Sequence, residues 1–284
     1  MTLHFLVVEG NTAAGREEYR IGFGKAPNES YADALREIAP GAACDVCFPA
    51  DSGADLPATL AGYDGVFLTG SALNVYDGGP AVERQIELAR SVFASGAPFF
   101  GSCWGLQVAC AAAGGRVLKN PRGREIGFAR RIWPTDAGRH HPLLDGRPPA
   151  YDALCSHIDV VELPPGGVPL ASNEMANVQA AEIVFAGGRF WGVQYHPEFS
   201  FAEVAAIVER RADALAREGF AVDGNAGRAY AGDLRALDEG RATGPLTWSL
   251  GAGESVLTAK ARRLELSNFI AERVLPEKSE RGRA

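Results

Sequence analysis

The fold is decided by one short stretch, Pro98-Phe99-Phe100-Gly101-Ser102-Cys103-Trp104-Gly105. It begins as an apolar strand. Residues 104–113 then continue as a run that is apolar on nearly every face and stops at Gly114-Gly115, which is typical of a buried helix with a glycine C-cap. Cys103 therefore lies at a strand-to-helix junction between glycines, the pattern of a nucleophile elbow. Such a turn needs glycines because its backbone is strained and neighbouring chain comes close. Unpaired N–H groups at the helix start favour the thiolate, which is the attacking species.

The segments around this junction alternate between apolar strands and helical patterns. Strand-like runs occur at 3–8, 43–48 and 65–70, and helical spacing occurs at 31–38 and after Pro80. This alternation predicts βα units on a mostly parallel sheet. Further on, Glu182–Phe185 and Phe190–Tyr195 flank a glycine-containing turn, so we expect a hairpin whose second strand ends at His196.

Composition excludes several classes of protein. The chain has 284 residues, 46% of them hydrophobic, which is too apolar for a disordered protein and enough for a large core. A net charge of −7 argues against a nucleic-acid or anionic-membrane partner, because those surfaces require a basic patch. No apolar run approaches the roughly 20 residues of a membrane span, and residues 1–9 lack the pattern of a signal peptide. With five cysteines in no disulfide framework, we expect a cytoplasmic protein.

The chain divides near residue 219. A helical pattern over 201–219 closes the main domain, 1–219, and from Phe220 the composition shifts towards Gly, Arg and Ala. We expect 220–284 to be a C-terminal helical extension, with helices at 228–240 and 255–274. Its role stays open: it could cover the active-site mouth, mediate self-association as in a homodimer, or dock a partner. Leu264, Ile270 and Val274 at helical spacing favour docking onto the main domain.

A nucleophilic cysteine needs an imidazole base, and the imidazole needs an acceptor that fixes its tautomer. His196 and Glu198 in Gln194-Tyr195-His196-Pro197-Glu198 provide both groups, and Pro197 fixes the backbone between them. His157 is a rival, because Asp159 could orient it in the same way. Sequence spacing alone does not choose between the two histidines.

The other four cysteines are interpreted as packing residues. Cys44 and Cys47 have the form CxxC, but no second pair completes a zinc site, and on a strand the two sulfurs point to opposite faces. Cys110 and Cys155 have no partner motif. We predict no metal site and no organic cofactor, because nucleophile and base are both side chains.

Four motifs, in order and spacing, resemble those of class I (triad-type) glutamine amidotransferase domains. They are Thr69-Gly70-Ser71, the stretch 101–107, Ser156-His157-Ile158-Asp159 and Tyr195-His196-Pro197-Glu198. The likeness is to the stand-alone relatives of the glutaminase domain of GMP synthase and covers residues 3–215. It implies a flavodoxin-like three-layer sandwich with a mostly parallel central sheet, and it favours His196 over His157 as the base.

The resemblance also implies a role for each motif residue. Cys103 attacks the carboxamide of glutamine, His196 protonates the departing ammonia, Glu198 orients His196, and water hydrolyses a γ-glutamyl thioester. Backbone N–H groups of Trp104 and of the Gly70-Ser71 turn hold the oxyanion. The implied substrate-binding residues are Gln107, Tyr76, Glu125, Gly127, Ser156 and His157. One departure stands out: the family commonly reads Gly-Gly-Pro where this chain has Gly70-Ser71-Ala72.

Two enzyme functions and one non-enzyme function follow. The first is a glutaminase subunit that passes ammonia to a separate synthase partner, since this chain has neither a GxxxxGK[ST] loop nor a Ser-Gly-Gly-x-Asp ATP loop. The second is a free-standing hydrolase of γ-glutamyl amides or peptides. The third, a catalytically idle binding protein on this fold, is disfavoured by intact Cys103, His196 and Glu198.

Overall fold

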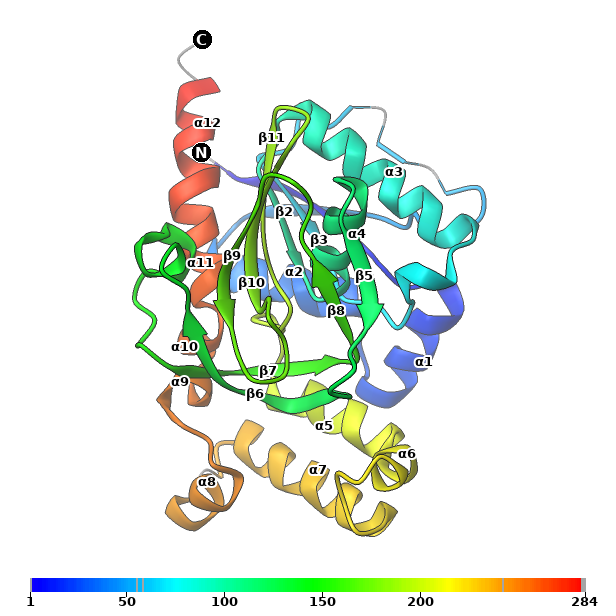
Figure 1. Ribbon diagram of the computed structural model, residues 1–284, viewed down its shortest axis with the longest axis vertical. Coiled ribbons are helices and arrows are strands. Elements are labelled where there is room, and N and C mark those ends of the chain that lie inside the picture. The colour runs from blue at the N-terminus through cyan, green and yellow to red at the C-terminus, as the bar shows by residue number, and fades with distance from the viewer. Residues whose placement is uncertain (1, 55, 58, 242, 282–284) are drawn as a thin grey trace.

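The computed structural model describes residues 2–54, 56–57, 59–241 and 243–281. Within these ranges the centre of the molecule is a nine-stranded mixed sheet (Figure 1). Its strands, in spatial order, are β2 (Ala43–Cys47), β1 (His4–Val8), β3 (Gly65–Leu68), β4 (Phe99–Ser102), β11 (Gly188–Val193), β10 (Ala180–Phe185), β9 (Gly167–Ser172), β6 (Glu125–Pro134) and β7 (Tyr151–His157). The pairings from β2 to β11 are parallel and those from β11 to β7 are antiparallel. A separate antiparallel pair joins β5 (Arg116–Lys119) to β8 (Asp159–Glu162).

Helices cover both faces of the parallel part of the sheet, as its sequence requires. Phe5 and Val7 of β1 pack in one apolar cluster, and Leu6 and Val8 pack in the other. A strand that buries both faces reads as a continuous apolar run, which is how residues 3–8 appear. α2 (Pro27–Ile38) and α11 (Leu264–Phe269) contribute to the first cluster, and α3 (Pro80–Ser95) and α4 (Trp104–Ala112) contribute to the second. The predicted three-layer α/β class is confirmed.

A third apolar cluster lies beneath β6 and β7, at the bottom of Figure 1. It joins these strands to α5 (Phe201–Arg210), α6 (Ala212–Arg217), α7 (Gly224–Asp238), α8 (Gly244–Leu250) and α9 (Glu254–Leu257). The single helix predicted over 201–219 is wrong, because the helix is divided at Arg211.

The last helices of the chain run along the opposite side of the molecule to α1 (Ala13–Phe23), and the last described residues lie at the top of Figure 1. α10 (Ala259–Arg262) and α11 are followed by a π-helical stretch, Ile270–Val274, and by α12 (Leu275–Arg281). The single helix predicted over 255–274 is wrong, because Thr258 has extended backbone and its side chain caps α10. The division at residue 219 stays a prediction; Phe269 nevertheless packs against Phe67, Phe100 and Trp191 in the core of the sheet.

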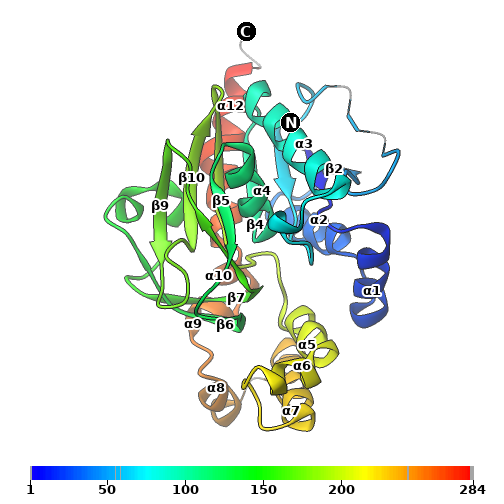
Figure 2. The same cartoon turned by 45° about the vertical axis from the view of Figure 1, so that its right-hand side comes forward.

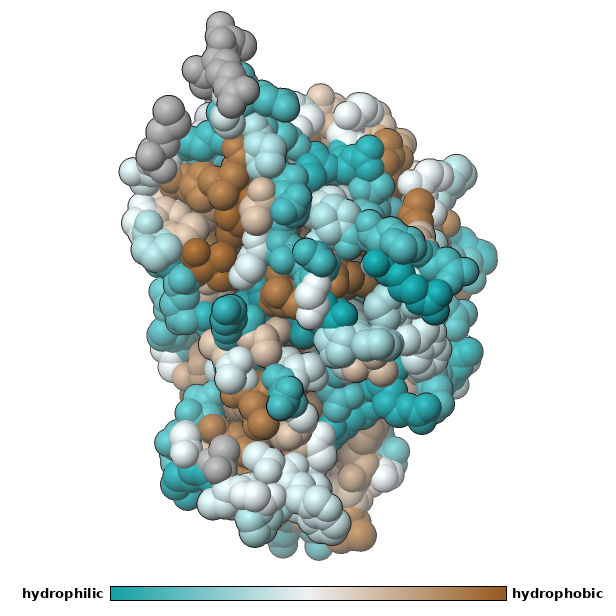
Figure 3. All heavy atoms as spheres, turned by 90° about the vertical axis from the view of Figure 1, so that its left-hand side faces the viewer, coloured by the Kyte–Doolittle hydropathy of each residue, from teal (hydrophilic) through white to brown (hydrophobic). Residues whose placement is uncertain are grey.

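The surface on the side of α11 and α12 mixes polar and apolar side chains (Figure 3). Leu275 of α12 is 49% exposed. Self-association through the extension stays a prediction. Among the described residues, no helix has the length and apolar character needed to span a membrane.

The sequence analysis predicted neither α1 nor the short helices α8 and α12. α1 (Ala13–Phe23) stands at the edge of the molecule beside α2 (Figure 2). It buries none of its residues, so it has no apolar stripe from which a helix could be predicted. Its ends are marked instead by caps: Thr12 accepts a hydrogen bond from the Gly15 N–H, and Gly24 adopts the left-handed conformation.

Candidate active site

The elbow forms where β4 meets α4. Cys103 is the residue between them and has a backbone φ of +52°, which is strained for a residue other than glycine. Glycine is required on each side of Cys103 because a side chain at either position would collide with neighbouring backbone. A Cβ on Gly101 would lie 2.8 Å from the Gly105 backbone, and one on Gly105 would lie 2.5 Å from the Leu68 carbonyl oxygen. Cys103 therefore caps a buried helix and faces the carboxyl edge of the sheet.

Strand register brings the candidate base to the nucleophile. β4 and β11 are parallel neighbours in which Ser102 pairs with Val193, and the Cys103 N–H donates to the Val193 carbonyl at 2.8 Å. The chain leaving β11 therefore runs beside Cys103 and carries His196 into the same cavity. Gly70 lies against this histidine so closely that a Cβ would be 2.6 Å from the His196 Cε1 atom.

Glu198 and Phe199 hold the imidazole of His196. The Nδ1 of His196 donates to Glu198 Oε1 at 2.7 Å, and the ring stacks on Phe199 with centroids 3.8 Å apart. Burial lowers the pKa of His196, but the Glu198 carboxylate and hydrogen bonds to Cys103 and Glu198 more than offset it and raise the pKa to about 10. The imidazolium that results favours a thiolate beside it.

His157 has different partners. Its Nδ1 lies 3.1 Å from the Asp159 carbonyl oxygen, and its Nε2 lies 2.9 Å from Glu125 Oε2. Both ring nitrogens therefore face acceptors, and neither is free to take a proton from Cys103. The side chain of Asp159, predicted as its orienting group, instead accepts from the Tyr76 hydroxyl at 3.0 Å.

Glu125, Cys155 and His157 form a buried group whose candidate ligand atoms lie within 4.8 Å of one another. Both oxygens of Glu125 already accept hydrogen bonds, Oε1 from Asn173 at 2.6 Å and Oε2 from Gln179 at 2.7 Å as well as from His157. Burial raises the pKa of the Cys155 thiol well above its usual range, and Glu125 raises it further. The arrangement is a hydrogen-bonded cluster behind the cavity.

The turn after β3 is organised by a residue that the sequence analysis missed. Asn11 Oδ1 accepts from the Ala72 N–H at 3.0 Å, and Asn11 Nδ2 donates to the Gly70 carbonyl at 3.2 Å. Asn11 is held in turn by Glu9, which is buried and accepts from its Nδ2 at 2.9 Å. These contacts shape Gly70-Ser71-Ala72 where the family motif has Gly-Gly-Pro. Side-chain amides after a first strand are common, so only the structure reveals this role.

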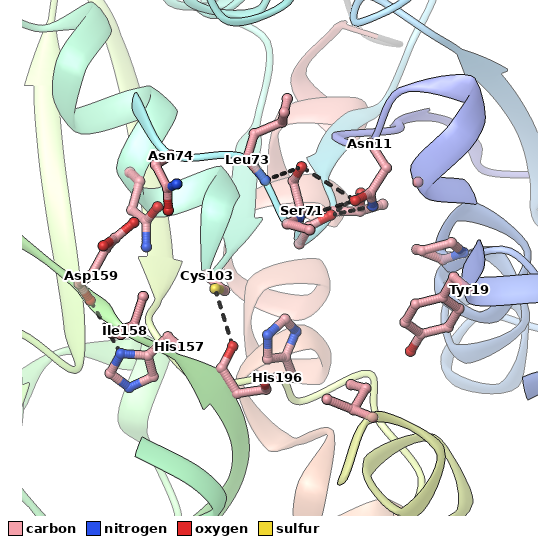
Figure 4. A pocket seen from close by; sticks show the side chains of 18 of the residues that line it. Asn11, Tyr19, Ser71, Leu73, Asn74, Cys103, His157, Ile158, Asp159 and His196 are labelled. Atoms are coloured by element: carbon pink, nitrogen blue, oxygen red, sulfur yellow. Dashed lines mark hydrogen bonds between the residues drawn. The ribbon is translucent and has the colours of Figure 1, made fainter. Parts of the chain in front are cut away.

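One cavity of about 370 Å³ gathers most of the predicted residues (Figure 4). This lies within the roughly 300–1,000 Å³ typical of small-molecule sites. Its lining includes Cys103, His196, Glu198, Gly70, Ser71, Gln107, Tyr76, Ser156 and His157. Trp104 lies next to Cys103 as the first helical residue, where its N–H has no partner within the helix.

Two predicted substrate-binding residues do not line this cavity. Glu125 lies behind His157 in the cluster described above. Gly127, in the left-handed region at φ +82°, lies against Tyr230, whose hydroxyl would be 2.7 Å from an added Cβ. Strand pairing turns this part of β6 towards α7. The positions of Glu125 and Gly127 therefore do not support their assignment as substrate-binding residues.

The remaining cysteines contrast with Cys103. Burial raises the pKa of Cys47 and of Cys110 to about 12, so both remain thiols at neutral pH. Cys44 and Cys47 contribute to apolar clusters on opposite faces of the sheet. These contacts agree with the interpretation of these cysteines as packing residues.

Comparison with known proteins places the chain among amide-hydrolysing enzymes. The sequence profile described as "Glutamine amidotransferase class-I" matches residues 23–211. The γ-glutamyl-L-1-hydroxyisopropylamide hydrolase of a Pseudomonas species is 37% identical over 220 residues, covering 76% of this chain and 75% of that protein. The glutamine-hydrolysing GMP synthase of Leifsonia xyli is 32% identical over 200 residues, covering 69% of this chain but 38% of the synthase.

Solved structures share the fold. A glutamine amidotransferase from Thermotoga maritima superposes with a TM-score of 0.66 at 18% identity, covering 97% of this chain and 99% of that one. A glutamine amidotransferase from Methylobacillus flagellatus gives a TM-score of 0.61 at 20% identity, covering 95% of each chain.

Proposed function

Because the chain belongs to the class-I glutamine amidotransferase family, we propose that it is a free-standing hydrolase of γ-glutamyl amides that uses a Cys103–His196–Glu198 triad. The observation that carries the proposal is the strained Cys103 at the elbow, in one cavity with an imidazole that donates to a buried carboxylate. Three quarters of the Pseudomonas hydrolase is covered by this chain, which supports a hydrolase that acts without a fused partner domain.

The first half-reaction forms a thioester. The Cys103 thiolate attacks the γ-carbonyl carbon, and the carbonyl oxygen becomes an oxyanion that the Trp104 N–H and the Gly70-Ser71 turn stabilise. The His196 imidazolium then gives its proton to the nitrogen as the C–N bond breaks, and the amine departs. Glu198 keeps the ring oriented throughout, because its hydrogen bond fixes Nδ1 as a donor.

The second half-reaction regenerates the enzyme. Neutral His196 takes a proton from water, the hydroxide adds to the thioester carbon, and the C–S bond breaks to release glutamate and the thiolate. The imidazolium and thiolate are then restored as a pair. Besides the substrate and the side chains named above, these proposed reaction steps use only water.

Replacing the nucleophile tests the proposal. The purified protein alone is expected to release amine and glutamate from a γ-glutamyl amide, and Cys103→Ala is expected to abolish this release while leaving the thermal melting temperature within a few degrees. Mass spectrometry of the enzyme during turnover should find a glutamyl adduct on Cys103. Near-normal turnover by Cys103→Ala would refute the assignment.

A second candidate is a glutaminase subunit whose ammonia passes to a separate synthase. It is favoured by the likeness to GMP synthase, of which this chain covers only 38%. The two functions differ in one measurement. A subunit is silent on glutamine until its partner is added, whereas a free-standing hydrolase turns over a γ-glutamyl amide unaided.

A further inference from the structure

The cavity around Cys103 extends in two directions. His157 and Asp159 line one side, and Tyr19 of α1 lines the other, with His196 on the Tyr19 side of Cys103 (Figure 4). α5 packs against α1 and contributes Glu203 and Ile207, one helical turn apart, to the same lining. We call the part lined by Tyr19, Glu203 and Ile207 the α1–α5 lobe.

The chemistry fixes which half of the substrate reaches this lobe. The amide nitrogen must lie next to the group that protonates it, and that group is His196 in the proposed mechanism. The glutamyl half extends away from the carbonyl carbon on the other side. Any substituent on the nitrogen therefore points past His196 towards Tyr19. Glutamine, whose leaving group is ammonia, carries no substituent there.

Resting on the proposed function, we propose that the α1–α5 lobe receives the substituent of the departing amine, and that Tyr19 and Glu203 select small amines bearing a hydroxyl group. The Tyr19 hydroxyl donates to Glu203 Oε1 at 3.4 Å, near the outer limit of a hydrogen bond. A substrate hydroxyl beside this pair can accept from Tyr19 and donate to Glu203. Ile207 offers apolar contact to the methylene groups that carry the hydroxyl.

Burial keeps Tyr19 in the protonated form that this recognition needs. Burial raises the pKa of Tyr19 well above its usual range, and the carboxylates of Glu203 and Glu198 raise it further, so the phenol stays a donor. Glu203 Oε2 is occupied by the Ser200 N–H at 2.8 Å, so Oε1 is the oxygen that faces Tyr19. A site that hydrogen-bonds a hydroxyl discriminates against the analogue lacking it, because that analogue leaves Tyr19 and Glu203 with only their long mutual hydrogen bond.

The lobe depends on α1, and all of this helix except its last residue, Phe23, precedes the match to the family profile. α1 is held by Tyr19, which packs partly buried against the apolar cluster beneath β6 and β7, and by ion pairs. Arg16 binds Asp51 with its two guanidinium nitrogens at 3.1 and 2.7 Å, and Arg210 of α5 lies 3.4 Å from Glu18. The part of the wall that α1 contributes, including Tyr19, therefore lies outside the segment that matches the family profile.

A matched substrate pair tests the inference. The values of kcat/KM are measured for γ-glutamylethanolamide, for γ-glutamylethylamide, which lacks only the hydroxyl, and for glutamine. Wild-type protein is expected to favour the ethanolamide over the ethylamide by about tenfold or more. Tyr19→Phe removes the donor and is expected to lower that ratio at least about fivefold, and Glu203→Gln should lower it in the same direction. Ile21→Ala, at a position 80% exposed on the same helix, is the control and should leave the ratio unchanged.

The outcomes separate the two proposals. An unchanged ethanolamide-to-ethylamide ratio in Tyr19→Phe, or no preference in the wild type, overturns the role of the lobe while the hydrolase stands. A wild-type protein that is no more active than Cys103→Ala on all three substrates overturns the proposed function, and the inference with it. Melting temperatures of each variant show whether a changed ratio comes from a folded protein.

Discussion

His196 illustrates how neighbouring residues set the chemistry of a side chain. It is buried, which alone would favour the neutral ring, yet the Glu198 carboxylate 2.7 Å from Nδ1 and the hydrogen bond to Cys103 reverse this and raise its pKa to about 10. Phe199 prevents the ring from turning away. The ring is thus held as a cation in the cavity that Cys103 lines, as the proposed triad requires.

Removing the charge of Glu198 should lower the pKa of His196. With Glu198→Gln the imidazolium loses its carboxylate partner, so the titration midpoint of His196, followed by NMR, is expected to fall from about 10. In the wild type this ion pair stabilises the fold fully below about pH 6.5 and is lost as the pH rises through about 10; in the variant the loss comes at lower pH. We expect kcat to fall roughly 100-fold or more. Glu174→Gln, at an exposed position, is the control; an unshifted His196 midpoint in Glu198→Gln would contradict the coupling.

Glu203 differs from His196, because its surroundings favour the neutral, protonated form of the side chain. Burial raises its pKa from 4.5 to about 7, with the Ser200 N–H opposing and Glu198 adding to the rise. The folded protein therefore binds a proton between about pH 4.5 and 7 that the unfolded chain does not, so the free energy of unfolding falls as pH rises through this window. At about 1.4 kcal/mol per pKa unit the effect is at most roughly 3 kcal/mol.

Glu203→Gln should flatten this pH dependence. The amide oxygen of glutamine can still accept from the Ser200 N–H, so the helix cap survives. Urea unfolding at pH 5 and pH 8 is expected to give a smaller difference in the variant than in the wild type. Equal differences in the two proteins would show that burial of Glu203 does not set the pH dependence.

At the scale of elements, the site is made where strands end. β4 delivers Cys103 and β11 delivers His196 because the two strands are parallel neighbours in register. β3 ends at the turn that Asn11 shapes, and β7 ends at His157. The elbow between β4 and α4 leaves no room for a side chain on Gly101 or Gly105.

A methyl group in the elbow should disturb both stability and activity. In Gly105→Ala the new Cβ would lie 2.5 Å from the Leu68 carbonyl oxygen, so α4 and Cys103 must shift. Overpacking of this kind costs about 1–3 kcal/mol, and we expect turnover to fall with it. Gly232→Ala in α7 is the matched control, because its Cβ meets nothing within 4 Å and should stabilise the helix slightly. Calorimetry and turnover of the two variants compare them, and equal melting temperatures would contradict the crowding argument.

At the scale of the whole molecule, the C-terminal segment is tied to the strand end that carries His196. Arg147 and Glu265 of α11 form a buried ion pair with N–O distances of 2.7 Å, and Glu265 also accepts from Tyr195 at 2.8 Å. Tyr195 immediately precedes His196. Residues far apart in the chain therefore support the same site.

Removing one partner of this ion pair should destabilise the protein more than replacing both partners. Glu265→Ala leaves the Arg147 guanidinium buried without its counter-charge and is expected to lower the free energy of unfolding by roughly 3–5 kcal/mol. The double variant Arg147→Met with Glu265→Leu replaces both charges by apolar groups and should recover much of that loss. Denaturant unfolding measures both. A double variant that is less stable than Glu265→Ala would contradict the account.

The fold class, the family and the residues of the triad hypothesis could all be predicted from the amino-acid sequence, because each depends on local signals. Glycines around Cys103, continuous apolar strands and His-Pro-Glu can all be read within a few residues. The other features of the site became visible only in the folded protein. Both nitrogens of His157 prove to be engaged, Asn11 holds the Gly70-Ser71-Ala72 turn, Glu125 and Gly127 lie outside the cavity, and α1 contributes Tyr19 to its lining. These facts arise from strand register and from contacts between distant segments, and no local pattern of side chains encodes them.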